Sequence, residues 1–169
     1  MNEEVTVATG DEMRDLGRRL AALLRAGDLI ILNGPLGAGK TTLTQGIGEG
    51  LSVRGRVTSP TFVISRVHPR AGGGSGPALV HVDAYRLGSV LELDDLDLDA
   101  DTDTAVTVVE WGEGLAEGLA EDRLEVTITP ADDAGWSLEG DRPRTVRISG
   151  VGTRWQDIQL TRTDVIDRL

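Results

Sequence analysis

Nine consecutive residues carry the clearest chemistry in this sequence. Residues 34–42 read GPLGAGKTT, and the spacing G-x-x-x-x-G-K-[ST] is met by Gly34, Gly39, Lys40 and Thr41. In this pattern the glycines let successive backbone N–H groups converge on the phosphates of a nucleotide, the lysine neutralises the outer phosphates, and the hydroxyl reaches Mg²⁺. The pattern therefore predicts a phosphate-binding loop, or P-loop.

The basic residues support this prediction by their distribution. Lys40 is the single lysine among the seventeen basic residues, so the other sixteen are arginines. A bulky planar guanidinium cannot replace a compact ammonium inside a tight phosphate loop. The one lysine thus stands where the chemistry requires an ammonium group.

Magnesium also needs a carboxylate, and P-loop enzymes usually supply it from the end of a buried strand. Asp83 follows the apolar run ALVHV, and Glu110 follows AVTVV. We expect each acid at a carboxyl edge of the sheet beside the phosphates. Each acid taken alone is equally consistent with an ordinary strand-end carboxylate.

Several neighbours of these acids have two interpretations. His81 lies two residues before Asp83, so a strand places both side chains on one face. There His81 either orients the acid or a water, or is a buried histidine satisfied by hydrogen bonds. Tyr85 is followed by Arg86, which is placed to approach phosphates or an acidic partner, or to form a surface salt bridge. Trp111 is more typical of packing than of base stacking.

The elements that position these residues follow from apolar periodicity. Thr9 and Glu12 fit a capping box, and helical spacing continues through Met13, Leu16, Leu20, Leu23 and Leu24. Gly27 is a plausible C′ residue of this helix. The apolar run 29–32 predicts a buried strand immediately before the loop, and a helix is expected at 42–51 behind it.

Later segments complete an α/β domain. Strands are expected at 61–67, 78–86, 105–109, 124–130 and 144–150, with a glycine-rich surface loop between the first two and a closing hairpin formed by the last two. Residues 91–104 carry seven acidic side chains, which indicate a solvated helix followed by a loop rather than a metal cluster. The tail through residue 169 is expected to be a surface helix or frayed.

The fold class predicted from these elements is α/β, with a P-loop NTPase-like mixed sheet flanked by helices and a C-terminal β-hairpin. We expect one domain over residues 1–169, with the nucleotide site within 5–115 and the closing strands and tail at 120–169.

Composition excludes several kinds of function. The chain has no cysteine, which excludes disulfides, thiolate metal sites and cysteine nucleophiles. A formal net charge of −11 repels phosphate backbones, so unaided binding to nucleic acid is not expected. No segment has the roughly 18 apolar residues that span a bilayer, so no membrane association and a cytoplasmic location are expected.

Four motifs together resemble a known family. GPLGAGKTTLTQGIGEGL, VTSPTF, HVDAYRL and VVEWGE, in this order and at these separations, closely resemble the bacterial TsaE (YjeE) family, the ATPase of tRNA threonylcarbamoyladenosine synthesis. The resemblance covers about residues 5–115. It implies a P-loop fold that binds and hydrolyses ATP with Mg²⁺ when assembled with the transferase TsaD and its partner TsaB. Those two proteins hold the tRNA, which is modified at adenosine 37.

The resemblance also implies roles for individual residues. The phosphates of ATP would be contacted by Gly37, Ala38, Gly39, Lys40, Thr41 and Thr42. Thr41 and Glu110 would hold Mg²⁺, and Asp83 would help to place or activate the attacking water.

A second segment matches the family by resemblance alone. Ser59, Pro60 and Thr61 match its switch-like loop. The sequence departs from the usual family pattern at Pro35, where an aspartate is usual, and at Met13, where a threonine is frequent.

Three rival functions were compared with this interpretation. A GTPase typically selects guanine with an Asn-Lys-x-Asp element, which this chain cannot supply because its one lysine is Lys40. A small-molecule kinase needs an acceptor pocket and an arginine-rich lid, neither of which can be located in the sequence. A nucleotide-dependent adaptor or scaffold in the same complex would need Lys40 but tolerate loss of Glu110.

Overall fold

The computed structural model describes residues 1–35, 37–55, 57, 65–73, 76–84, 104–110, 120–131 and 142–160. Within them, seven strands form one sheet in the order β1-β7-β6-β2-β5-β4-β3. The strands are β1 (Asn2–Val7), β2 (Leu29–Asn33), β3 (Ser65–His68), β4 (Ala78–Asp83), β5 (Ala105–Glu110), β6 (Arg123–Pro130) and β7 (Arg144–Val151). The helices are α1 (Gly10–Ala21) and α2 (Lys40–Gly50), with short 3₁₀ turns η1 (Ala71–Gly73) and η4 (Thr153–Trp155).

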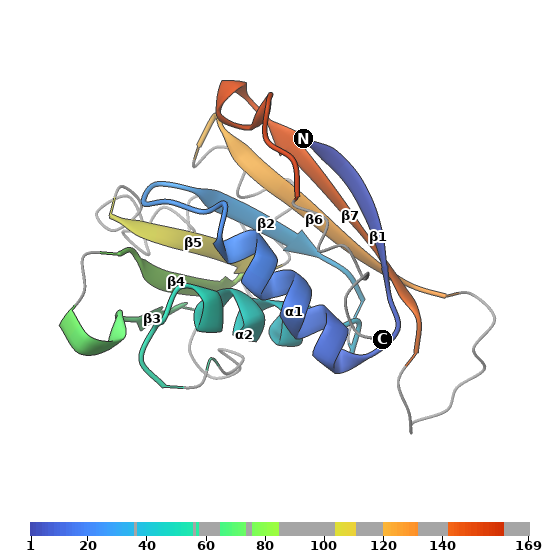
Figure 1. Cartoon of the computed structure of the whole chain (residues 1–169), viewed down its shortest axis with the longest axis horizontal. Coiled ribbons are helices and arrows are strands. Elements are labelled where there is room, and N and C mark those ends of the chain that lie inside the picture. Colours follow the sequence, from blue (N-terminus) through green and yellow to red (C-terminus); the bar gives the residue numbers. More distant parts are fainter. Residues whose placement is uncertain are drawn as a thin grey trace, which may run out of the picture.

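The sheet is mixed, as the sequence predicts. β2 runs parallel to β5 and β6, and β5 runs parallel to β4. The hairpin of β6 and β7 is antiparallel, and β1 and β3 add antiparallel edges. Figure 1 shows α1 and α2 together on one face of this sheet. The α/β class and the closing hairpin are therefore confirmed.

The central strand β2 is buried on both faces. Ile30 and Leu32 lie in the core beneath α1 and α2, whereas Leu29 and Ile31 belong to a second cluster on the opposite face. A strand covered on both faces reads as a continuous apolar run, which is why LIIL was recognisable in the sequence. The residues that follow β2 are therefore held at a fixed position on the sheet.

Helix α1 begins as predicted but ends earlier. The Thr9 hydroxyl accepts a hydrogen bond of 3.1 Å from the backbone N–H of Glu12, as in a capping box. The helix ends at Ala21 with Ala22 as its C-cap, so the prediction of Gly27 as C′ residue is wrong. Gly27 has φ 93° in the turn before β2, where its N–H bonds to the carbonyl oxygen of Ala105.

Two glycines allow α1 and α2 to approach closely. A β-carbon at Gly17 would lie 2.4 Å from the carbonyl oxygen of Leu43, and one at Gly46 would lie 2.0 Å from that of Arg14. Both obstacles are backbone atoms, which cannot rotate away. The glycines of α2, poor helix formers in isolation, are therefore required by the neighbouring helix.

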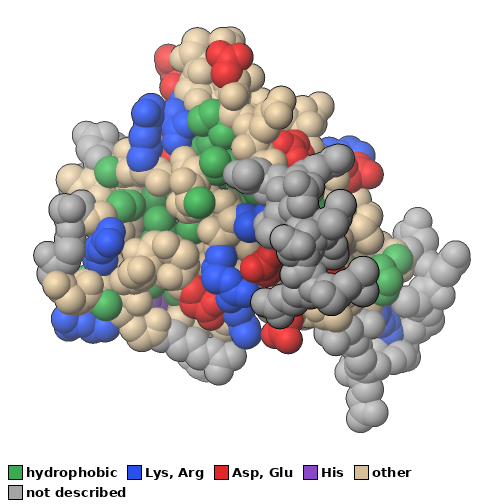
Figure 2. Space-filling model, viewed as in Figure 1, with side chains coloured by type: hydrophobic (Ala, Val, Ile, Leu, Met, Phe, Trp, Pro, Cys, Tyr) green, Lys and Arg blue, Asp and Glu red, His purple; other side chains and the backbone are tan. Residues whose placement is uncertain are grey.

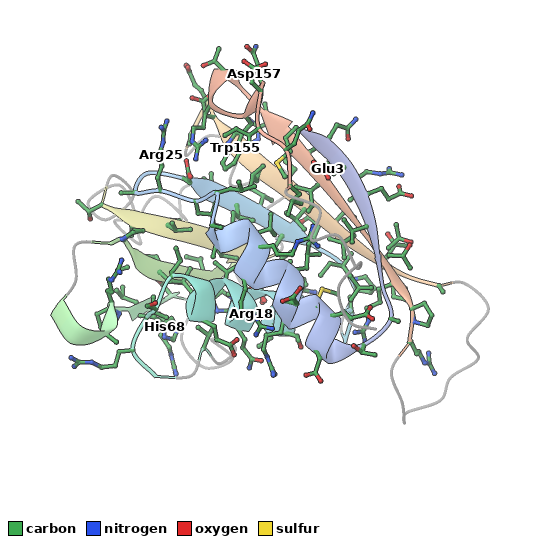
Figure 3. The ribbon with its side chains drawn as sticks, viewed as in Figure 1. Glu3, Arg18, Arg25, His68, Trp155 and Asp157 are labelled. Atoms are coloured by element: carbon green, nitrogen blue, oxygen red, sulfur yellow. The ribbon has the colours of Figure 1, made fainter. Side chains whose placement is uncertain are left out.

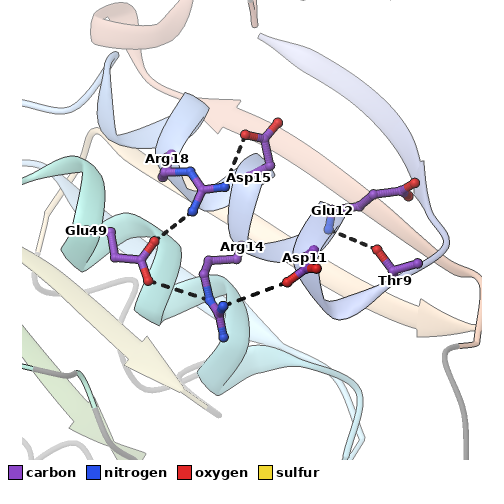
Figure 4. A network of polar contacts seen from close by, with 7 residues as sticks. All are labelled: Thr9, Asp11, Glu12, Arg14, Asp15, Arg18 and Glu49. Carbon is purple, nitrogen blue, oxygen red and sulfur yellow. Dashed lines mark hydrogen bonds and ion pairs between the residues drawn. The ribbon is translucent and has the colours of Figure 1, made fainter.

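Charged side chains cover the outer surface of this helix pair. Glu49 of α2 accepts a 2.7 Å hydrogen bond from Arg18 and lies 3.6 Å from Arg14, while Asp11 and Asp15 complete the network within α1 (Figure 4). Figure 2 shows basic and acidic side chains next to one another near the centre of this face. Exposed pairs of this kind add little stability, typically below about 1 kcal/mol each, so the helices are held together mainly by their buried contact.

The segment after β7 is packed rather than frayed. Trp155 is fully buried, and the guanidinium of Arg154 lies 4.2 Å from its ring centroid. Arg154 also bonds both carboxylate oxygens of Asp28, at 3.2 and 3.0 Å. Figure 3 labels Trp155 and, in the turn before β2, Arg25. The predicted surface helix or frayed tail is thus wrong for residues 153–160, and residues 161–169 lie outside the described part.

Other predictions meet the structure only in part. Strand β1 is not predicted from the sequence, because only two of its residues, Val5 and Val7, are apolar and it forms an exposed edge of the sheet. The strand expected at 61–67 is described from Ser65 onward, and the strand expected at 78–86 ends at Asp83. The acidic segment lies outside the described residues except for Thr104. None of the described helices is long and apolar enough to cross a membrane.

The helix contact gives a first prediction. Replacing Gly46 with Ala forces a β-carbon against the Arg14 carbonyl, and overpacking of this kind costs about 1 to 3 kcal/mol in the free energy of unfolding. Gly10→Ala is the matched control, because a β-carbon there meets nothing within 4 Å. Urea denaturation measures both variants. Equal stability of the Gly46 variant and the wild type would contradict the proposed contact.

Candidate functional site

The loop between β2 and α2, described except at residue 36, has glycine at the positions where its backbone requires one. Gly37 has φ 76° and Gly39 has φ 110°, values that favour glycine because other residues are strained there. At Gly34 the constraint is space, since a β-carbon would lie 2.9 Å from the carbonyl oxygen of Ile128 on β6. The two glycines that the motif requires, Gly34 and Gly39, and Gly37 between them are thus each explained by backbone geometry or by a close approach.

The amino end of α2 presents its dipole without a capping side chain. Gly39 is the N-cap and makes no side-chain bond, and the first turn of α2 contains no acidic residue. By contrast, α1 has the Thr9 cap and two acidic residues, Asp11 and Glu12, in its first turn. The first N–H groups of a helix carry partial positive charge, so the start of α2 suits an anion that comes from outside the chain.

Lys40 is held inside the loop. Its side chain is buried to 7% relative exposure, and its Nζ donates to the carbonyl oxygens of Gly34 at 2.5 Å and Pro35 at 3.2 Å. Burial lowers the pKa of Lys40, while the nearby carboxylates of Glu110 and Asp83 act in the opposite direction. The ammonium group is therefore close to both acids and is partly desolvated.

The strand register brings the two acids to one edge. Glu110 lies opposite Asp83 of β4 and opposite Leu32 of β2, two residues before Gly34. Val108, two residues before Glu110, packs in the core beneath α1 and α2, and alternation along the strand places Glu110 on the same face. The acids thus end at the edge and on the face from which the loop and α2 begin.

His81 contacts Glu110 in the interior. The Nε2 of His81 lies 3.2 Å from Oε1 of Glu110, and the two side chains are 0% and 5% exposed. Neither ring nitrogen of His81 has a hydrogen-bond partner among the described residues, and the same holds for Oε1 of Glu110. The structure therefore places His81 beside Glu110, whereas the sequence had paired it with Asp83.

A magnesium ion fits this arrangement of donors. Oε1 of Glu110 is a buried carboxylate oxygen that lacks a hydrogen-bond donor in the described part of the chain, at the edge where α2 begins with Lys40 and Thr41. No three His, Asp or Glu residues gather into a metal cage among the described residues. Mg²⁺ in nucleotide sites is usually held by one or two protein oxygens, substrate phosphates and water, so a cage is not required.

The predicted site residues fall into two groups. The structure brings one group together around the loop: Gly34, Gly37, Ala38, Gly39, Lys40, Thr41, Thr42, His81, Asp83 and Glu110. The other group lies outside the described residues: Ser59, Pro60, Thr61, Tyr85, Arg86 and Trp111. The last described residue before Ser59 in the sequence is Val57, whose carbonyl oxygen accepts a 3.0 Å hydrogen bond from Gln45 of α2.

Two residues outside the predicted site also border the loop. Met13 of α1 is fully buried, and its Cε would lie 3.2 Å from a β-carbon at Gly39, so it supports the loop from the core. Arg144 of β7 donates a 3.3 Å hydrogen bond to the carbonyl oxygen of Gly37. Only a long-range contact reveals Arg144, because it is 107 residues away in sequence.

The fold and the loop define a mixed α/β protein of the P-loop kind, and comparison with known proteins identifies the family. Residues 7–137 match the family model described as threonylcarbamoyl adenosine biosynthesis protein TsaE. The chain therefore belongs to the TsaE family.

Individual relatives agree with this family. A Streptomyces coelicolor protein named tRNA threonylcarbamoyladenosine biosynthesis protein TsaE is 61% identical over 144 residues, which are 85% of this chain and 93% of that protein. A Mycobacterium bovis protein of the same name is 51% identical over 130 residues, or 73% of this chain and 76% of that protein. The crystal structure of Bacillus subtilis YdiB is similar with a TM-score of 0.68 at 30% identity, covering 92% of this chain and 89% of that one.

A buried histidine on the edge strand β3 predicts a pH effect on stability. His68 of β3, labelled in Figure 3, is 6% exposed, and burial, His81 and Arg66 lower its pKa below the ordinary 6.5. As the pH falls, the His68 imidazole is protonated in the unfolded chain before it is protonated in the folded one. The neutral, buried His68 therefore contributes fully to the free energy of unfolding above about pH 6.5, and this contribution is lost as the pH falls toward the folded-state pKa.

Replacing His68 with Gln removes this titrating group. Urea denaturation at about pH 7.5 and pH 5.5 should therefore show a smaller loss of unfolding free energy in His68→Gln than in the wild type. Arg66→Gln is a matched variant, because removing one of the charges that lower the pKa should give an intermediate loss. The same loss in all three proteins would show that His68 does not titrate in this range.

Proposed function

We propose that this chain binds and hydrolyses ATP with Mg²⁺ in support of a TsaB–TsaD complex that threonylcarbamoylates adenosine 37 of tRNA. Family membership and the names of the relatives support a place in tRNA threonylcarbamoyladenosine biosynthesis. The single observation that carries the nucleotide chemistry is the P-loop between β2 and α2, with Lys40, Glu110 and Asp83 around it.

Each group has a defined task in this proposal. The backbone N–H groups of residues 37–42 and the start of α2 bind the phosphates, and Lys40 exchanges its carbonyl partners Gly34 and Pro35 for phosphate oxygens. Thr41 and Glu110 hold Mg²⁺, which when bound neutralises charge that develops on the outer phosphates. Asp83, beside Glu110 on β4, positions or activates the attacking water.

The charge of the chain bears on its partners. A net charge of −11 opposes direct binding of RNA, so the tRNA is held by TsaD and TsaB in this proposal. The proposal places ATP hydrolysis in the complex with TsaB and TsaD, not in the isolated chain, and takes water as the phosphate acceptor. We further propose that residues 1–169 act as one domain in the cytoplasm.

Lys40 gives the first test of nucleotide binding. A bound ligand raises the melting temperature by mass action, so Mg·ATP should stabilise the wild type and leave Lys40→Ala unchanged. Lys40→Arg should behave like Lys40→Ala, because a bulky planar guanidinium should not replace the compact ammonium that bonds the carbonyl oxygens of Gly34 and Pro35. Thermal denaturation with and without Mg·ATP measures this. Stabilisation of Lys40→Arg equal to that of the wild type would contradict the proposed fit.

Glu110 tests hydrolysis separately from binding. Glu110→Gln keeps the shape but removes the charge, so ATP turnover in the presence of TsaB and TsaD should fall by about 100-fold or more. Glu125→Gln is the control, since Glu125 on β6 pairs with Arg123 at 2.9 Å, away from the loop. Phosphate release and nucleoside analysis of the tRNA are the two readouts. Full tRNA modification by Glu110→Gln without turnover would establish an adaptor instead of an ATPase, and turnover that needs a small-molecule acceptor would establish a kinase.

A further inference from the structure

A basic side chain of the closing hairpin reaches the phosphate loop. Arg144 is the first residue of β7, and its Nη2 donates to the carbonyl oxygen of Gly37 over 3.3 Å. Its Nη1 would lie 3.3 Å from a β-carbon built at Gly39. The guanidinium therefore contacts the loop at Gly37 and lies close to Gly39.

Arg144 lies at the same edge and on the same face of the sheet as the proposed metal site. It pairs with Pro130 at the end of β6 and with Val7 at the end of β1, so it stands at the carboxyl edge of the parallel strands. Val146 and Ile148 pack in the core beneath α1 and α2, and alternation along β7 turns Arg144 toward that face.

The strand order separates Arg144 from the acids. β2, which carries the loop, has β5 and β4 on one side and β6 and β7 on the other. In the proposed site, Mg²⁺ and the outer phosphates lie toward Glu110 and Asp83. The α-phosphate and the nucleoside of the same ligand therefore extend in the opposite direction, toward Arg144.

The guanidinium has the shape and charge to pack against a base. It is planar and stacks on aromatic rings, including those of ligands. The chain has five aromatic residues, and Trp155, the one within the described part, is buried at the other end of β7. No described carboxylate forms an ion pair with Arg144, so within that part its charge is not neutralised by an acid.

We propose that Arg144 is a specificity residue that stacks its guanidinium on the purine base of the nucleotide bound at the loop, with its bond to Gly37 fixing the plane of the group. This inference rests on the proposed function, because it needs a nucleotide in the loop. It adds a nucleoside contact from β7 to a site otherwise built from β2, α2, β4 and β5.

The experiment compares a ligand that has a base with one that has phosphates alone. Titration calorimetry of the full chain with Mg·ATP and with Mg·tripolyphosphate is performed on the wild type, Arg144→Gln, Arg144→Lys and the control Arg147→Gln. Arg147 is on the same strand but alternates to the other face and pairs with Glu4 at 3.1 Å, so it matches the charge removed without contacting the loop.

Both Arg144 variants should bind Mg·ATP about tenfold more weakly and keep their affinity for Mg·tripolyphosphate within about twofold, because stacking acts on the base alone. Arg147→Gln should match the wild type with both ligands. This pattern supports the stacking contact, since loss of a phosphate contact would weaken both ligands.

Several outcomes would overturn the inference. A parallel loss for both ligands would show that Arg144 only positions the loop, and normal ATP affinity in Arg144→Lys would show a charge contact with phosphate. Unchanged ATP affinity in Arg144→Gln, or wild-type affinity for tripolyphosphate equal to that for ATP, would remove the base contact while leaving the phosphate loop intact. Failure of the wild type to bind either ligand would instead refute the proposed function.

Discussion

The structure depends on one buried ammonium group held at the end of a central strand. Burial of Lys40 removes water from its ammonium group and so lowers its pKa. The charged group is stabilised there by the carbonyl oxygens of Gly34 and Pro35 and by the nearby carboxylates of Glu110 and Asp83. A charge in this position is tolerated only because the surrounding polar groups are fixed. The loop, the start of α2 and the ends of β4 and β5 can be understood as the set of groups that fix it.

The packing of the helices places the start of α2 beside the loop. α2 begins at Lys40 and packs closely on α1, and Gly17 and Gly46 permit that approach. Met13 of α1 then packs against Gly39 from below. A substitution at the contact between α1 and α2 is therefore expected to shift α2 and, with it, the loop that precedes α2.

Short-range patterns in the sequence predicted the parts of the site that local geometry determines. The glycine spacing predicts the tight loop, in which the positive φ of Gly39 favours glycine, and LIIL predicts a strand buried on both faces. The Thr9 cap was equally local, because donor and acceptor lie three residues apart.

What the sequence could not show depends on contacts between distant segments. The contact of His81 with Glu110 instead of Asp83 results from the register of β4 against β5. Arg144 reaches Gly37 only because the hairpin folds back beside β2. Strand β1 has too exposed a pattern to be recognised alone and is held by its pairing with β7. The sequence predicts Gly27 as a C′ residue because a glycine follows the helical spacing, but its φ of 93° belongs to the turn before β2.

The most direct test is a crystal structure of the full chain with Mg²⁺ and a non-hydrolysable ATP analogue. The account predicts the triphosphate on the backbone N–H groups of residues 37–42, Lys40 moved from the carbonyls of Gly34 and Pro35 to the phosphates, and Mg²⁺ bound by Thr41 and Glu110. An analogue bound elsewhere, with Lys40 still bonded to those two carbonyls, would contradict it.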